Sequence, residues 1–227
     1  MSRRPPALAA LLLLALLLGC ASKPTPGLVD TEAVKRLQAR AAYDRGVQQM
    51  ESQQLAPAYI AFREAALLDE TNAVYHDALG VALLQLRRPD LALAEFERAV
   101  ALDSNFSNAI FHLGLGLTEM QRWPEAVATL KRAVAMPTLP APQLAWQTLG
   151  VALLNLGQLA DAEGALRFAI GLDPEMSSAY YNLGLVLVGA NRPNEARAAF
   201  RRTRELAPES AFGQAAGERL KALGEGG

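Results

Sequence analysis

Residues 146–175 read WQTLGVALLNLGQLADAEGALRFAIGLDPE, and residues 180–209, which read YYNLGLVLVGANRPNEARAAFRRTRELAPE, repeat the same pattern 34 residues later. In both stretches an aromatic residue is followed three residues later by Leu-Gly. An alanine, a large apolar residue and a proline then follow at the same spacing in the two stretches. A fixed period of about 20 to 50 residues is typical of proteins built from repeated structural units. The architecture therefore depends on how far this period extends along the chain.

The period extends over most of the sequence. Three series of residues, each recurring at intervals of 34, 34, 36 and 34 residues, are Gly46, Gly80, Gly114, Gly150 and Gly184; Ala58, Ala92, Ala126, Ala162 and Ala196; and Phe62, Phe96, Leu130, Leu166 and Phe200. Three parallel series that share one two-residue shift do not arise by chance. They predict five units, at about residues 39–72, 73–106, 107–142, 143–176 and 177–210.

Each unit is expected to be a pair of antiparallel helices. Alanine and leucine dominate the composition and aromatic residues make up 6%, which favours helices over sheets. The repeated glycine and alanine are small enough to let two helices approach closely, and we expect the phenylalanines to fill the space between one pair and the next. Four prolines mark expected starts of second helices, because proline suits a first helical turn: Pro57, Pro89, Pro124 and Pro193.

The pattern resembles the tetratricopeptide repeat, whose signature is aromatic-x-x-Leu-Gly-x-x-Tyr, Ala-x-x-x-Phe and Pro. Leucine replaces the tyrosine of that signature, at Leu153 and Leu187. The resemblance covers residues 39–210 and implies an all-α fold, a right-handed superhelical solenoid of about five stacked helical hairpins. With residues 31–38 extending the first helix and residues 211–224 forming a C-terminal capping helix, the repeat domain is expected to span residues 30–224.

Two irregularities interrupt the pattern. The stretch MPTLPAPQ, residues 136–143, carries the two-residue shift and three prolines, and we interpret it as a tolerated surface insertion, with a hinge as the alternative. Thr203 stands where the other units have an alanine, which predicts looser packing near the C-terminal end.

Residues 1–19 have the layout of a secretory signal peptide. Arg3 and Arg4 precede twelve uninterrupted Ala and Leu residues, a run shorter than the roughly twenty residues that span a bilayer. The run ends in Leu-Leu-Gly-Cys20, which resembles a bacterial lipobox and implies cleavage before Cys20 and lipidation of its sulfur. Ala21 as the next residue implies export to the outer membrane. The alternative is a signal peptide with an incidental cysteine.

Residues 20–29 are predicted to be a lipidated flexible tether, since they contain prolines and a glycine without an apolar pattern. Two or three acyl chains would form an effectively permanent anchor. The expected location is therefore the periplasmic face of the outer membrane.

Charge and composition exclude several functions. The chain has 22 Lys and Arg against 23 Asp and Glu, without a basic block of the kind that binds nucleic acid. Its single cysteine cannot form an intramolecular disulfide, and His76 and His112 lack further residues to complete a metal site. No catalytic motif stands out from the repeats, so we predict neither a metal, a cofactor nor a small-molecule substrate. An enzyme built on the repeats is the alternative from a different class.

First helices line the concave side of such a solenoid, and the resemblance indicates which of their residues face inward. The candidate groove residues, taken from units three to five, are Phe111, Leu115, Thr118, Gln147, Val151, Asn155, Tyr181, Asn182 and Leu185. The inward positions of units two to five contain no lysine or arginine, which disfavours recognition of an acidic peptide terminus. An amphipathic helix or an extended apolar segment of another envelope protein is the expected ligand. For Val81, Leu115, Val151 and Leu185, packing between helices is an equally good interpretation.

The lipobox, the residue after it and the repeat array together resemble the pilotin lipoproteins that help assemble the secretin pore of type IV pili. Those proteins generally carry six units, whereas this sequence has five. The resemblance implies a lipid-anchored, non-catalytic scaffold for protein assembly. An adaptor for peptidoglycan hydrolases or proteases is the second interpretation.

Overall fold

The computed structural model describes residues 31–224. The predicted signal peptide, the lipidation site Cys20 and the tether lie outside the described residues. Within residues 31–224 the chain forms eleven α-helices and no strand. The helices are α1 (Thr31–Glu51), α2 (Leu55–Leu68), α3 (Ala73–Gln85), α4 (Pro89–Leu102), α5 (Ser107–Glu119), α6 (Trp123–Val134), α7 (Pro142–Asn155), α8 (Leu159–Leu172), α9 (Ser177–Gly189), α10 (Pro193–Leu206) and α11 (Ala211–Ala222).

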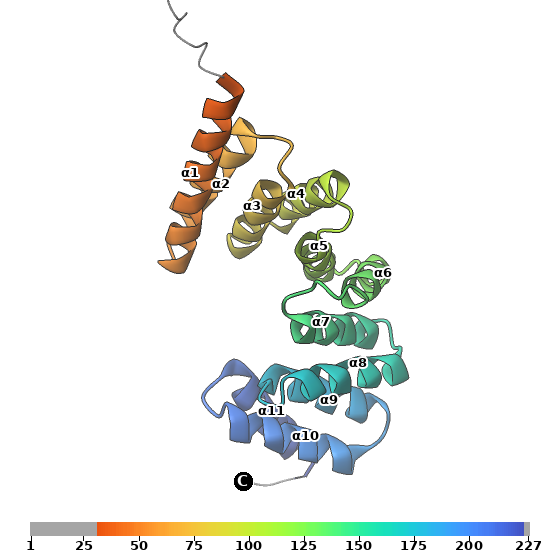
Figure 1. Cartoon of the computed structure of the whole chain (residues 1–227). Coiled ribbons are helices and arrows are strands. Elements are labelled where there is room, and N and C mark those ends of the chain that lie inside the picture. Colours follow the sequence, from red (N-terminus) through yellow and green to blue (C-terminus); the bar gives the residue numbers. More distant parts are fainter. Residues whose placement is uncertain (1–30, 225–227) are drawn as a thin grey trace, which may run out of the picture.

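The helices stack in chain order into a curved array (Figure 1). Consecutive helices form the hairpins α1/α2, α3/α4, α5/α6, α7/α8 and α9/α10, and α11 packs against α10 and α9. The predicted all-α solenoid of five hairpins with a C-terminal capping helix is confirmed. Residues 31–38 belong to α1, which is the longest helix in the described part of the chain.

The repeated glycine makes each hairpin tight. A Cβ atom built at Gly80 would lie 2.5 Å from the Phe96 ring of the same hairpin, and one at Gly150 would lie 2.6 Å from Leu166 Cγ. Because glycine has no Cβ, the large side chain of the second helix rests directly on the backbone of the first. The phenylalanine therefore closes its own hairpin, which the sequence analysis did not anticipate. Phe96 also approaches the next hairpin, where a Cβ at Gly116 would lie 3.5 Å from its ring.

The turn within each hairpin passes through one residue with a left-handed backbone. Only the fourth hairpin places a glycine there, Gly157, with a φ of 73°. The equivalent residues of the other hairpins, with φ between 57° and 61°, are Gln53, Arg87, Gln121 and Asn191. The geometry of the turn is thus uniform although its sequence is not.

Both irregularities place a residue in the core. In the loop between α6 and α7, the Thr138 carbonyl accepts a hydrogen bond from Ser107 Oγ at 3.1 Å, and Leu139 is buried in the core. Pro137, Thr138 and Pro140 are exposed, so the segment is a surface loop that places one apolar side chain in the core. Thr203 is fully buried, and its hydroxyl donates to the Ala199 carbonyl at 3.1 Å. The expectation of looser packing at Thr203 is wrong, because the hydroxyl is satisfied within its own helix.

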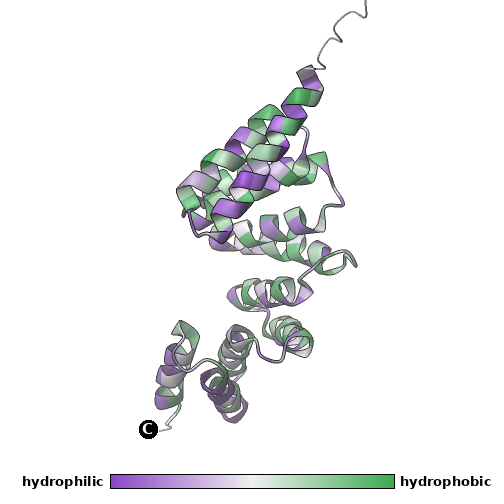
Figure 2. Ribbon diagram, turned by 60° about the vertical axis from the view of Figure 1, so that its left-hand side comes forward, coloured by the Kyte–Doolittle hydropathy of each residue, from purple (hydrophilic) through white to green (hydrophobic). Residues whose placement is uncertain are grey.

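The core consists of two clusters that follow the stack. One is formed by α1 to α4 and the other continues from α4 to α11, with Leu113 packed against both. Hydrophobic and hydrophilic residues both occur along the helices throughout the stack (Figure 2). Among residues 31–224, none of the helices has the length and hydropathy that crossing a bilayer requires.

Candidate functional site

The odd-numbered helices form the inner row of the stack. Packing contacts join α3 to α5, α5 to α7, α7 to α9 and α9 to α11, whereas the even-numbered helices do not pack against one another to this extent within residues 31–224. Closer spacing of one row than of the other curves the array, so the odd-numbered helices line its concave side (Figure 1). We call the solvent-facing side of this row the inner face.

Helix α5 contributes three of the predicted groove residues. Phe111 is only 9% exposed and belongs to the core, with its ring 5.4 Å from that of His112. Leu115 is half-buried and lies outside both core clusters. The Thr118 hydroxyl donates to the Gly114 carbonyl at 2.9 Å. Leu115 is therefore the member of this set with apolar surface available to a ligand.

Helix α7 places three more of these residues beside them. Val151 is half-buried and, like Leu115, lies outside the core clusters. Gln147 is half-buried, and the exposed Asn155 donates from Nδ2 to the Val151 carbonyl at 2.9 Å. This helix offers a mixture of apolar and amide surface.

Helix α9 carries the remaining three. The Tyr181 ring lies 5.7 Å from that of Phe200 and 5.6 Å from that of Phe212 on the capping helix. Asn182 is 8% exposed, and Leu185 packs against the core. The structure thus brings all nine predicted residues onto three adjacent helices, where Phe111 and Asn182 are buried, Asn155 is exposed and the other six are half-buried.

A polar pair that was not predicted from the sequence joins two neighbouring inner helices. Asp77 on α3 and His112 on α5 form a hydrogen bond of 2.7 Å between Oδ1 and Nδ1, and their side chains are 10% and 23% exposed. His76 makes a similar contact of 2.7 Å, but to Glu95 within its own hairpin. Asp77 is an inward position of unit two, and His112 occupies the next inward position of unit three. Aligning the two units could therefore have revealed the pair. Among the described residues, no three potential metal ligands cluster.

The outer side carries an ion network between α8 and α10. Arg192 donates to Glu163 and to Glu195, each at 2.6 Å, and Arg167 donates to Glu163 at 2.9 Å. Burial raises the pKa of Glu163, but hydrogen bonds from Arg192 and Arg167 outweigh it and leave the pKa below its ordinary value. The hydrogen bond from Arg192 likewise lowers the pKa of Glu195. The network joins the outer helices of successive hairpins, so its role is structural.

Comparison with solved structures identifies proteins with the same fold. The chain is similar to PilW, described as a widely conserved type IV pilus biogenesis factor, with a TM-score of 0.75 and 22% identity over 82% of this chain and 86% of PilW. It is similar to PilF of Pseudomonas aeruginosa, with a TM-score of 0.68 and 21% identity over 85% of this chain and 95% of PilF. It also resembles YrrB, a TPR protein described as having an unusual peptide-binding site, with a TM-score of 0.62 and 20% identity over 78% of this chain and 90% of YrrB.

Sequence comparison establishes the family. Curated protein sequences give no significant match. The family model for the tetratricopeptide repeat matches residues 78–140, 113–167 and 148–211, which together cover more than half of the 227 residues. These matches agree with the hairpins and with their repeated glycine contacts. The chain therefore belongs to the tetratricopeptide-repeat family.

Proposed function

We propose that the chain is a lipid-anchored periplasmic scaffold that helps assemble an outer-membrane complex, the secretin pore of a type IV pilus. The observation that supports this proposal is the partly apolar inner face, which a ligand can reach. It lies on a solenoid whose fold is similar to that of PilW over 82% of this chain. Tetratricopeptide-repeat proteins are generally non-catalytic scaffolds that bind other polypeptides. The proposal assigns this role to the inner face formed by α5 and α7.

The chemistry of the inner face favours an amphipathic helix or an extended apolar segment of the secretin. Leu115 and Val151 present apolar surface on adjacent helices, while Gln147 and Asn155 supply amides beside them. A helix laid in such a groove buries its apolar face and keeps its polar side in water. The absence of lysine and arginine among the inward positions of units two to five leaves no cationic clamp for a carboxylate.

The anchor gives this binding a location. Lipidation at Cys20, followed by the tether of residues 20–29, would hold the repeats close to the inner surface of the outer membrane. Secretin subunits that reach this membrane would then meet the inner face before they insert. In this proposal the lipid anchor determines where the protein is located, and the repeats determine which polypeptide it binds.

The inner face is tested by substituting Leu115→Glu and Val151→Glu in the native organism. Each introduces a charge where a ligand would bury an apolar group, so detergent-resistant secretin multimers and surface pili should fall at least about tenfold. The matched control is Ile60→Glu, at a position on outer helix α2 that is 63% exposed. Circular dichroism and protein level should be unchanged in all three variants. Normal secretin assembly with both inner-face variants would contradict the proposal.

The anchor is tested separately with Cys20→Ala. The variant should lose labelling by a radioactive fatty acid and leave the membrane fraction, because one thiol carries the entire attachment. Secretin multimers should decrease while the helicity of the repeats stays the same. Continued membrane association without label would contradict the lipid anchor, whereas the inner face is judged by the preceding experiment alone.

A further inference from the structure

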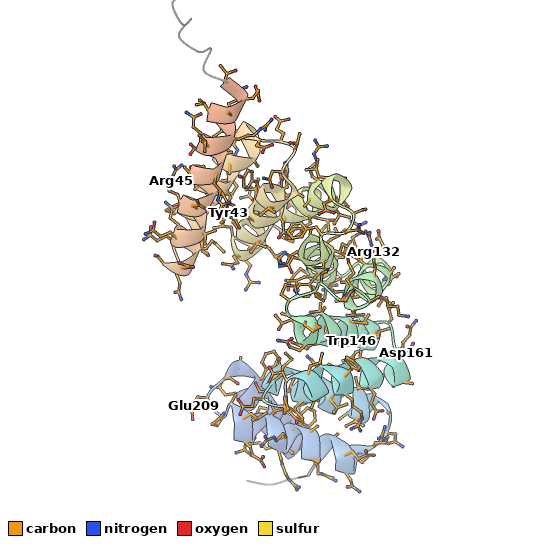
Figure 3. All side chains as sticks on the ribbon, viewed as in Figure 1. Tyr43, Arg45, Arg132, Trp146, Asp161 and Glu209 are labelled. Atoms are coloured by element: carbon orange, nitrogen blue, oxygen red, sulfur yellow. The ribbon has the colours of Figure 1, made fainter. Side chains whose placement is uncertain are left out.

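A cleft of about 610 Å³ lies on the outer side of the stack, between α6 and α8 and over α7. We call it the outer cleft. Its apolar floor comprises Trp146, Leu149 and Leu153, and Phe168 forms one wall. The rings of Trp146 and Phe168 lie 4.6 Å apart. Figure 3 shows Trp146 on α7 beside α8, with Asp161 on α8. The cleft is separate from the inner face and from the residues that the proposed function uses.

Phe168 departs from the pattern of the other units. The equivalent positions in units one, two, three and five are charged: Glu64, Arg98, Arg132 and Arg202. In the fifth unit the Arg202 guanidinium lies 6.0 Å from the centre of the Tyr180 ring, which occupies the place of Trp146. A charged side chain is therefore compatible with the fold at this position. The fourth unit instead exposes 53% of a phenylalanine.

Two glycines leave Phe168 uncovered. Gly164 and Gly171 lie about one helical turn to either side of it on α8, and a Cβ atom at either would meet nothing within 4 Å. A glycine inside a helix destabilises it relative to alanine. Neither glycine is therefore required by a close contact, in contrast to Gly150 in the same hairpin. Leu172, which is 46% exposed, continues the apolar surface beyond them.

The outer cleft also carries one charge of each sign. Lys131 on α6 and Asp161 on α8 both line it, and neither makes an ion pair or a side-chain hydrogen bond to another of the described residues. The neighbouring Arg167 is bound to Glu163 at 2.9 Å and does not neutralise Asp161. A ligand that fills the cleft and offers one anion and one cation would satisfy both groups.

We propose that the occupant of the outer cleft is a second copy of this chain, bound about a two-fold axis. In a two-fold interface the same surface of each copy contacts the other. That surface must therefore contain both a projection and a recess, and both a positive and a negative charge. The outer cleft has all four: the exposed Phe168, the recess over Trp146, Lys131 and Asp161. The exposed side of Phe168 in each copy packs on the apolar surface of the other copy's outer cleft, and Lys131 of each faces the other's Asp161. The inner faces of both copies stay free, so the dimer can hold two segments of one assembly.

The first test is the mass of the full chain purified in detergent, measured by sedimentation and light scattering over a range of concentrations. The wild type should be a dimer that dissociates on dilution. Phe168→Arg, which introduces the residue of units two, three and five, should raise the dimer dissociation constant at least about tenfold, because an aromatic anchor is lost. The matched control Ile60→Arg, on the exposed side of α2, should leave it unchanged. A wild type that is monomeric at every concentration would overturn the proposal.

The second test uses exchanged charges. Lys131→Glu alone and Asp161→Lys alone should each weaken the dimer, because each places like charges opposite one another twice. An equal mixture of the two variants should form a heterodimer, since the introduced glutamate of one copy then faces the introduced lysine of the other, while the native Lys131 and Asp161 face each other. Failure of the mixture to associate more tightly than either variant would overturn the two-fold arrangement. Circular dichroism of each variant checks that the repeats remain folded.

Discussion

Phe200 on α10 and Phe168 on α8 belong to consecutive hairpins and have opposite surroundings. Phe200 is fully buried against Gly184, whereas Phe168 is 53% exposed beside the outer cleft. Every hairpin places a large apolar residue at the position of Phe200, while Phe168 is the one apolar residue at a position that is otherwise charged. The comparison separates residues that the fold requires from residues that it merely tolerates. The second kind identifies surfaces with another purpose.

The largest expected difference comes from truncating the two phenylalanines. Phe200→Ala should lower the free energy of unfolding by about 3–5 kcal/mol, because it opens a cavity inside a hairpin. Phe168→Ala should lower it by less than about 1 kcal/mol, because half of the ring is already in water. Urea titrations followed by circular dichroism measure both, at a concentration where the chain is monomeric. Similar losses for the two variants would show that Phe168 is also required for folding.

A glycine pair within the fourth hairpin sharpens the comparison. Gly150→Ala should destabilise by about 1–3 kcal/mol, because its Cβ would lie 2.6 Å from Leu166 Cγ and force the helices apart. Gly164→Ala should stabilise by about 0.5–1 kcal/mol, since it adds helix propensity without a contact. Thermal and urea unfolding of both variants measure whether each substitution raises or lowers the free energy of unfolding. A destabilising Gly164→Ala would mean that the outer side of α8 is more crowded than the structure indicates.

The smallest effect concerns the ion network beside the outer cleft. The pKa of Glu163 is lower in the folded chain, so its charge stabilises the fold above the unfolded-state pKa, and this contribution is lost as the pH falls through the folded-state value. Glu163→Gln should therefore be less stable than the wild type near neutral pH, by under about 1 kcal/mol, and the difference should vanish in acid. The control Glu218→Gln, at an exposed pair with Lys221, measures the general effect of removing one carboxylate from the surface. A difference that persists in acid would indicate a packing effect.

The sequence predicted the fold because its determinants are local and repeated. The spacing of the glycines, such as Gly80 and Gly150, reports a close contact that recurs in each hairpin. The left-handed turn residues escaped notice because Arg87 and Gln121 carry no sequence signal for this conformation, which the surrounding hairpin imposes. Thr203 was misjudged because composition does not reveal that a hydroxyl can bond to its own helix.

The candidate site was predictable only in part. Inward positions follow from the repeat register, and Leu115 and Val151 lie there with accessible apolar surface. The register does not reveal how far a side chain turns toward the core, so Phe111 and Asn182 are more enclosed than a groove residue should be. The outer cleft had a signal in the sequence, the exchange of charge for phenylalanine at residue 168, which emerges only when the units are compared position by position.

The central claim, that the inner face of α5 and α7 holds a segment of another polypeptide, is tested most directly by photo-crosslinking in living cells. A photoreactive amino acid would replace Leu115 in one strain and the exposed Ile60 in another. We predict that the probe at 115 crosslinks to the secretin, at a segment that mass spectrometry can identify, and that the probe at 60 does not. Crosslinks to the secretin from position 60 alone, or none from position 115 in a folded and correctly located chain, would contradict the account.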